Sequence, residues 1–139
     1  MNNKIEIKED VTILHFDEIP ILFIGKNYKS DIVIGSLIFE DYDENTVKYF
    51  HSIIHSKLAI KFLKGKISYL DVLHKAAYLS IVTKDYNDNI LNVEGKKLAE
   101  IDASFLPLPS SFCPDVDNRI VFKLEELIEK PMLNAVNSI

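Results

Sequence analysis

Four residues near the middle of the chain have side chains that can bind a metal ion: His51, His55, Asp71 and His74. If they lay on a helix, His51 and His55 would share one face, as two ligands of one zinc ion must. The residues around His51 favour a strand instead, in which this spacing separates the two imidazoles by about 13 Å. No Glu follows His51, so the H-E-x-x-H signature of zinc proteases is absent. We therefore expect structural or surface histidines, and a small metal-dependent hydrolase using these four residues is the alternative hypothesis.

Two further side chains have reactive groups, Cys113 and His15. No histidine or basic residue beside Cys113 would lower the pKa of its thiol, so we interpret it as a small hydrophobic residue. His15 lies in an apolar stretch and is predicted to be a packed histidine. The chain has no G-x-S-x-G motif, phosphate-binding Gly loop or dinucleotide fingerprint. We expect no catalytic residue and no cofactor. The sequence leaves open whether the protein is an enzyme and favours a non-catalytic role.

Two acidic segments, 41–45 and 85–89, match the start of a calcium-binding EF-hand loop. Such a loop needs Gly at its sixth position for a sharp turn and Glu at its twelfth as a bidentate ligand. The sixth positions here are Thr46 and Ile90, and neither twelfth position is Glu. Both segments are therefore predicted to be turns.

Charged side chains gather in two places that could meet a partner. A stripe of lysines, spaced i, i+4 and i+7, lies along one face of a predicted helix. The helix that follows is mostly apolar, so it cannot read base edges as the recognition helix of a DNA-binding protein does. The second place is an acidic turn between two predicted strands. The candidate partner-binding residues are Lys57, Lys61 and Lys64 of the lysine stripe, and Asp41, Asp43 and Glu44 of the acidic turn.

The composition is that of an ordinary globular domain. The 139 residues are 47% apolar and 27% charged, which is enough to bury one core. A net charge of −5 argues against binding to nucleic acid, which normally requires a basic excess. No segment has the apolar length of a signal peptide or a membrane span. With one cysteine and no internal disulfide possible, we expect a single-domain protein of the cytoplasm that binds neither membrane nor nucleic acid.

The clearest local structure is a helical corner at 62–77. Gly65 can adopt the left-handed conformation that ends one helix, because it has no Cβ. Ser68 can cap the next helix, with Asp71 three residues later completing a capping box. Ile67 and Val72 stand on either side of the cap, where a hydrophobic staple would form. The corner predicts two short helices, over 56–64 and 68–77.

Strand-like segments surround this corner and predict an α+β fold with a mainly antiparallel sheet of about five to seven strands. Segment 32–39 is apolar on both faces, as in a central strand, and we expect its Ile34, Leu37 and Phe39 to be buried with Phe62 and Leu73. After the sheet, three prolines within 107–118 indicate an extended surface connection, and 125–136 has helical composition. The other segments with strand character are 4–8, 11–16, 21–24, 47–54, 78–83, 90–93 and 119–124.

Two short patterns resemble those of a group of small, functionally uncharacterised bacterial domains. One is the turn and strand start from Asp17 through Pro20 to Ile21, similar to a D-x-P-L-L-F strand start in that group. The other is F-L-K-G-K-I-S-Y-L-D, from Phe62 to Asp71 at the helical corner, similar to L-x-x-G-x-I-S-x-x-D in that group except that Phe stands in place of its first Leu. The resemblance covers residues 11–93 and implies a bacterial or phage source and an α+β fold. It provides no catalytic residue.

These observations predict a non-catalytic protein-interaction module, such as a regulatory subunit or an inhibitor or immunity-type protein. The hypothesis rests on the absence of catalytic motifs, on the acidic composition and on the abundance of Tyr and Phe, since aromatic residues are enriched in interface cores. We expect a partner protein, and the sequence also allows a homo-oligomer.

Overall fold

The computed structural model describes residues 7–27 and 29–114 and confirms the predicted α+β class. Its centre is a six-stranded antiparallel sheet with the strand order β1-β2-β3-β4-β5-β6. Each strand therefore lies beside its neighbour in sequence, as expected where short turns join most strands. The strands are β1 (Ile7–Asp17), β2 (Ile19–Asn27), β3 (Ile32–Asp41), β4 (Thr46–Ile54), β5 (Tyr78–Asp85) and β6 (Ile90–Gly95).

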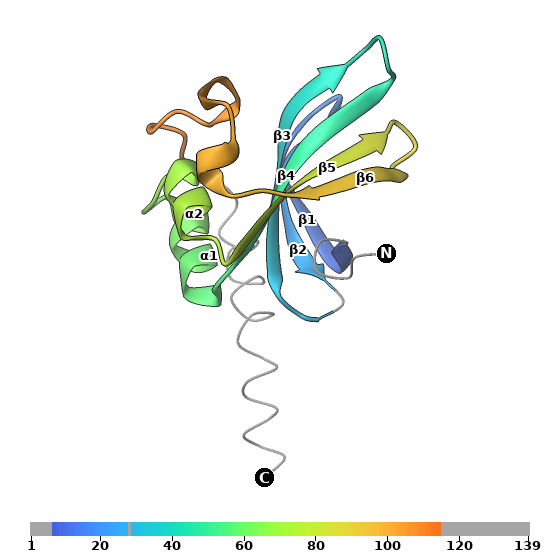
Figure 1. The fold of residues 1–139 in the computed structure, drawn as a ribbon. Coiled ribbons are helices and arrows are strands. Elements are labelled where there is room, and N and C mark those ends of the chain that lie inside the picture. Colours follow the sequence, from blue (N-terminus) through green and yellow to red (C-terminus); the bar gives the residue numbers. More distant parts are fainter. Residues whose placement is uncertain (1–6, 28, 115–139) are drawn as a thin grey trace.

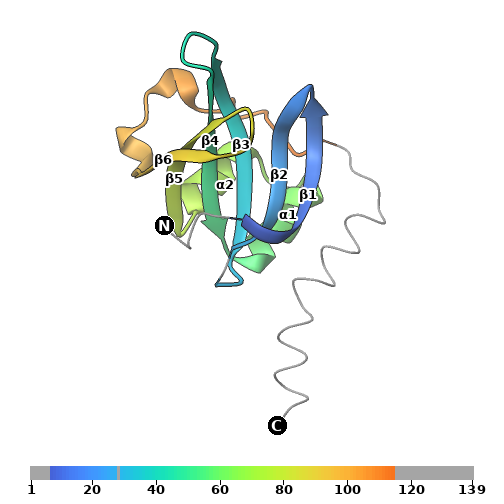
Figure 2. The same ribbon diagram turned by 90° about the vertical axis from the view of Figure 1, so that its right-hand side faces the viewer.

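The helices α1 (Ser56–Leu63) and α2 (Tyr69–Lys75) connect β4 to β5 and cover one face of the sheet (Figure 1). Two short 3-10 turns, η1 (Leu98–Glu100) and η2 (Ala103–Phe105), follow β6 on the same side. The sheet is strongly twisted and curved, as the view in Figure 2 shows. Within the described ranges no helix covers the opposite face.

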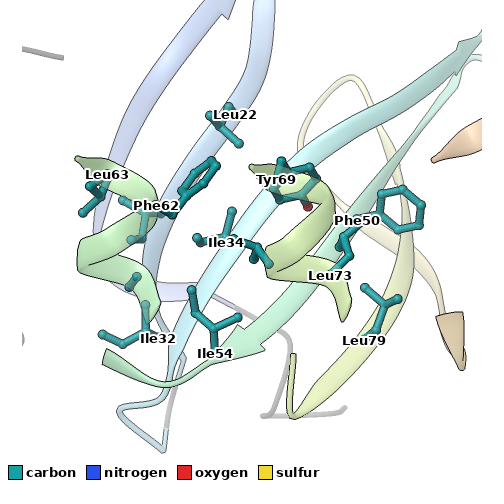
Figure 3. Close-up of a cluster of buried hydrophobic side chains, with 13 residues drawn as sticks. Leu22, Ile32, Ile34, Phe50, Ile54, Phe62, Leu63, Tyr69, Leu73 and Leu79 are labelled. Atoms are coloured by element: carbon teal, nitrogen blue, oxygen red, sulfur yellow. The ribbon is translucent and has the colours of Figure 1, made fainter. Parts of the chain in front are cut away.

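The main core lies between the sheet and the two helices (Figure 3). Ile34 on β3, Phe62 on α1 and Val72 on α2 are all fully buried, so each helix contributes at least one side chain that water does not reach. Burial on this scale is the main source of stability for so small a sheet. The cluster comprises Leu22, Ile24, Ile32, Ile34, Phe50, Ile54, Ala59, Phe62, Leu63, Tyr69, Val72, Leu73 and Leu79.

The helical corner forms as predicted. Gly65 has φ +71°, and the hydrogen bonds from Gly65 N to the Phe62 carbonyl and from Lys66 N to the Lys61 carbonyl are those of a Schellman motif. The Ser68 hydroxyl accepts a hydrogen bond from Asp71 N at 3.2 Å, and the Asp71 carboxylate accepts one from Ser68 N at 3.4 Å. The corner is thus specified by residues close together in sequence.

Three predictions about burial are wrong. Leu37 and Phe39 are only half-buried, because a β-bulge between them interrupts β3 and Phe39 stacks on the exposed ring of Phe105 at 5.5 Å. His15 is exposed rather than packed, since it lies on the edge strand β1. Ile34, Phe62 and Leu73 are buried as expected. The segments 4–6, 115–118, 119–124 and 125–136 lie outside the described residues.

The two acidic segments are turns, as predicted. In the β5–β6 turn the Asp85 carboxylate accepts hydrogen bonds at 2.9 Å from the backbone N–H groups of Asn87 and Asn89 and from the Asn89 side chain. These bonds favour the ionised form and hold the pKa of Asp85 below its ordinary value. The carboxylate therefore stabilises its own turn.

Candidate functional site

A cleft of about 1100 Å³ occupies the face of the sheet that the helices leave uncovered. Val11 and Ile13 line it from β1, while Leu91 and Val93 line it from β6. These two strands are the opposite edges of the sheet, and they border one cleft because the sheet curves. We call this space the cleft.

The floor of the cleft is built around Phe23 and Gly35, which face each other in the pairing of β2 with β3. The ring of Phe23 lies across Gly35, so that a Cβ at position 35 would be 2.2 Å from the Phe23 Cζ. Tyr49 and His51 on β4 complete the floor and form T-shaped contacts with Phe23, with ring centroids 5.4 Å and 5.7 Å from that of Phe23. Gly35 thus makes room for an aromatic floor.

Lys84 of β5 places its ammonium group over this floor. The Nζ lies 5.7 Å from the ring centroid of Phe23 and 5.5 Å from that of Tyr49, distances typical of cation–π contacts. It also lies 3.0 Å from Oδ1 of Asp88, and the side chain is only 14% exposed. The charge of Lys84 is therefore balanced within the protein by Asp88.

Tyr49 is also engaged inside the protein. Its hydroxyl donates a 2.8 Å hydrogen bond to the carbonyl oxygen of Pro20. Burial, together with the negative charges of Asp88 and Glu40, raises the pKa of Tyr49 to about 12. The phenol stays protonated at neutral pH and is not suited to act as a base.

Acidic turns lie at one end of the cleft. Because neighbouring strands are antiparallel, the β1–β2, β3–β4 and β5–β6 turns project from the same end of the sheet. Glu40 links two of these turns, since it accepts hydrogen bonds from Tyr42 at 2.7 Å and from Tyr86 at 3.1 Å. We call the carboxylates of this end the acidic rim; they are Asp17, Glu18, Glu40, Asp41, Asp43, Glu44, Asp85 and Asp88.

Apolar side chains along the cleft are open to solvent. Val11 is 46% exposed, Ile13 41% and Leu91 56%. Single exposed apolar residues are common on protein surfaces, whereas a group of them around a concavity is typical of binding sites. The cleft therefore combines an apolar wall, a packed aromatic floor and an acidic rim.

The two predicted partner-binding surfaces lie apart. Lys57 and Lys61 are exposed on α1 and Lys64 is exposed at its C-cap, whereas the β3–β4 turn projects from the other end of the molecule (Figures 1 and 2). The acidic turn belongs to the acidic rim beside the cleft. The sequence interpretation missed the apolar residues of β1 and β6, although the alternation of Val11 and Ile13 with polar neighbours was visible.

The four candidate metal ligands have separate surroundings. His51 is buried in the cleft floor, and His55 precedes α1, where its Nδ1 accepts a 3.2 Å hydrogen bond from Lys57 N. Asp71 completes the capping box of α2, and His74 is exposed in the last turn of that helix. Within 7–27 and 29–114, no three side chains of His, Cys, Asp or Glu come together as a metal site would require. The geometry therefore gives the hydrolase alternative no support.

Cys113 packs at the margin of the main core. Burial raises the pKa of its thiol to about 11, so the nucleophilic thiolate is scarce at neutral pH. This environment fits the interpretation of Cys113 as a small hydrophobic residue.

No family model, curated protein or solved structure matches the chain. The resemblance to small bacterial domains consequently stays a prediction. In the described part of the chain, no helix is both long enough and apolar enough to span a membrane.

Proposed function

We propose that the protein is a non-catalytic interaction module and that the cleft is where it binds a partner protein. The observation that carries this proposal is the exposure of apolar side chains from both edge strands around one concavity. Val11, Ile13 and Leu91 would each lose contact with water if a partner filled the cleft. Removal of such area from water is the main favourable term in protein association.

The polar groups of the floor support a role without catalysis. The ammonium group of Lys84 is matched by Asp88, and the hydroxyl of Tyr49 is bound to the Pro20 carbonyl. A general acid or base needs a proton that it can exchange with substrate near neutral pH. The raised pKa of Tyr49 makes it unsuited to that role. Its hydrogen bond to Pro20 and the ion pair of Lys84 with Asp88 instead hold the floor in one arrangement, which favours binding by limiting the entropy lost on association.

Site-specific photo-crosslinking tests the proposal. A photoreactive amino acid replaces Leu91 in the cleft or, as a matched control, Leu108, which is 71% exposed outside it. In cells that contain the native partner, we expect the full chain labelled at 91 to form one defined crosslinked product and the chain labelled at 108 to form none. Identical products from both positions, or no product from position 91, would contradict the proposal. A crosslink between two copies would show that the partner is the chain itself.

A further inference from the structure

The two edge strands that border the cleft differ in regularity. The pairing of β1 with β2 contains four register shifts, and such bulges make an edge a poor template for another strand. The pairing of β5 with β6 contains one shift, between Thr83 and Lys84, and is regular from there to Gly95. Among the described residues no strand pairs with the outer edge of β6. The backbone N–H and C=O groups of this edge can therefore pair with an added strand.

A strand added to β6 would enter the cleft. Leu91 and Val93 of β6 line one side of the cleft, and Val11 and Ile13 of β1 line the other. Side chains alternate between the two faces of a strand, so every second side chain of an added strand would point into the apolar space between these walls. The apolar walls of the cleft thus favour an extended occupant with apolar residues at alternate positions.

The charge around the cleft indicates which side chains the added strand would carry at its other positions. Lys84 is the one Lys or Arg among the described residues that line the cleft, and Asp88 already balances its charge. The carboxylates of the acidic rim are left in excess. Tyr86 and Tyr42 are exposed beside them, at 45% and 74%, and offer ring faces on which Arg or Lys can stack. The hydrogen bond of Tyr42 to Glu40 raises the pKa of Tyr42, and the negative charges of Glu40 and Glu18 add to this effect, which is consistent with a negative potential at this end.

We infer that the partner inserts an extended, cationic segment into the cleft as a seventh strand beside β6. The inference rests on the proposed function and names the chemistry of the partner: apolar side chains alternating with Lys or Arg. Main-chain hydrogen bonds to β6 would provide affinity, and the apolar walls and the acidic rim would provide specificity. Charge complementarity of this kind mainly accelerates association and makes it sensitive to salt.

A library of random twelve-residue peptides, selected on the immobilised full chain, tests the inference. We expect the selected peptides to be positively charged with alternating apolar residues, and to bind less tightly as salt increases. Versions in which Lys and Arg are replaced by Glu should not bind. Binding should protect the backbone amides of β6 from hydrogen exchange, because the added strand covers them. Leu91→Ser should weaken binding about tenfold, while the matched control Leu108→Ser should leave it unchanged.

The outcomes separate this inference from the proposed function. Selection of acidic or uncharged peptides, of no peptide at all, or of peptides that leave the β6 amides unprotected would overturn the inference. The proposed function would still stand if position 91 crosslinked to a partner in cells. If that crosslink were also absent, both would be wrong.

Discussion

Replacement of Gly35 by Ala tests how the floor of the cleft is built. The new Cβ would lie 2.2, 2.3 and 2.9 Å from three ring atoms of Phe23, and real Cβ atoms do not approach other atoms so closely. The ring is held between Tyr49, His51 and Lys84 and cannot shift freely. Overpacking of this kind costs roughly 1–3 kcal/mol of unfolding free energy. We therefore expect Gly35→Ala to destabilise the protein by that amount.

Removal of the Phe23 ring should make Gly35→Ala stabilising instead of destabilising. Phe23→Ala alone should cost about 3–5 kcal/mol, as for other buried aromatic residues. In that background the clash is gone, and Gly35 does not have a left-handed φ. Ala at position 35 should then stabilise the protein by about 0.4–1 kcal/mol, because it restricts the unfolded chain.

Urea denaturation followed by far-UV circular dichroism measures the unfolding free energies of the parent chain, the two single variants and the double variant. Equal m-values for the four proteins would show that these free energies can be compared. If Gly35→Ala cost the same with and without the Phe23 ring, the contact between ring and glycine would not be the cause. The description of the floor would then be wrong.

Three further predictions concern the corner, the cysteine and one turn. Because Gly65 has φ +71°, Gly65→Ala should lower the unfolding free energy by about 1–2 kcal/mol, Gly65→Asn by less and Gly65→Val by more. Equal melting temperatures for the three variants would contradict the left-handed conformation. Cys113, with its pKa raised from 9.0 to about 11, should react with iodoacetamide at pH 8 about 100-fold more slowly than in the urea-unfolded chain, and equal rates would refute its burial. The pKa of Asp85, followed by NMR, should lie below its ordinary value of 3.8, which is also its value in the unfolded chain. The carboxylate then stabilises the fold fully above pH 3.8, and this stabilisation is lost as the pH falls through the lower pKa of the folded state. A pKa at or above 3.8 in the folded protein would contradict the turn geometry.

The sequence predicted those parts of the fold that depend on neighbouring residues. Gly65, Ser68 and Asp71 lie within one short segment, and their conformations follow from local sterics and capping hydrogen bonds. The strands were recognisable from apolar runs and alternation, although their ends were placed a few residues short. The prediction of separate strands at 4–8 and 11–16 was wrong, because β1 runs without a break from Ile7 to Asp17. The antiparallel order followed because most of the connections are short turns.

The cleft was not predictable in the same way. It depends on the curvature that brings β1 and β6 to one space, and these edges are far apart in the sequence. The contact of Phe23 with Gly35 likewise depends on strand register, which no single segment specifies. The bulge that leaves Leu37 and Phe39 half-buried arises from the pairing of two strands, so an apolar pattern in one strand could not show it.

The central claim is that the partner occupies the cleft. Its most direct test is the affinity of the partner identified by crosslinking for the full chain, measured by calorimetry with Leu91→Ser and Leu108→Ser side by side. Both substitutions remove the same exposed side chain, one within the cleft and one outside it. We predict about tenfold weaker binding for Leu91→Ser and unchanged binding for Leu108→Ser. Equal affinities for the two variants, with both folded, would contradict the claim.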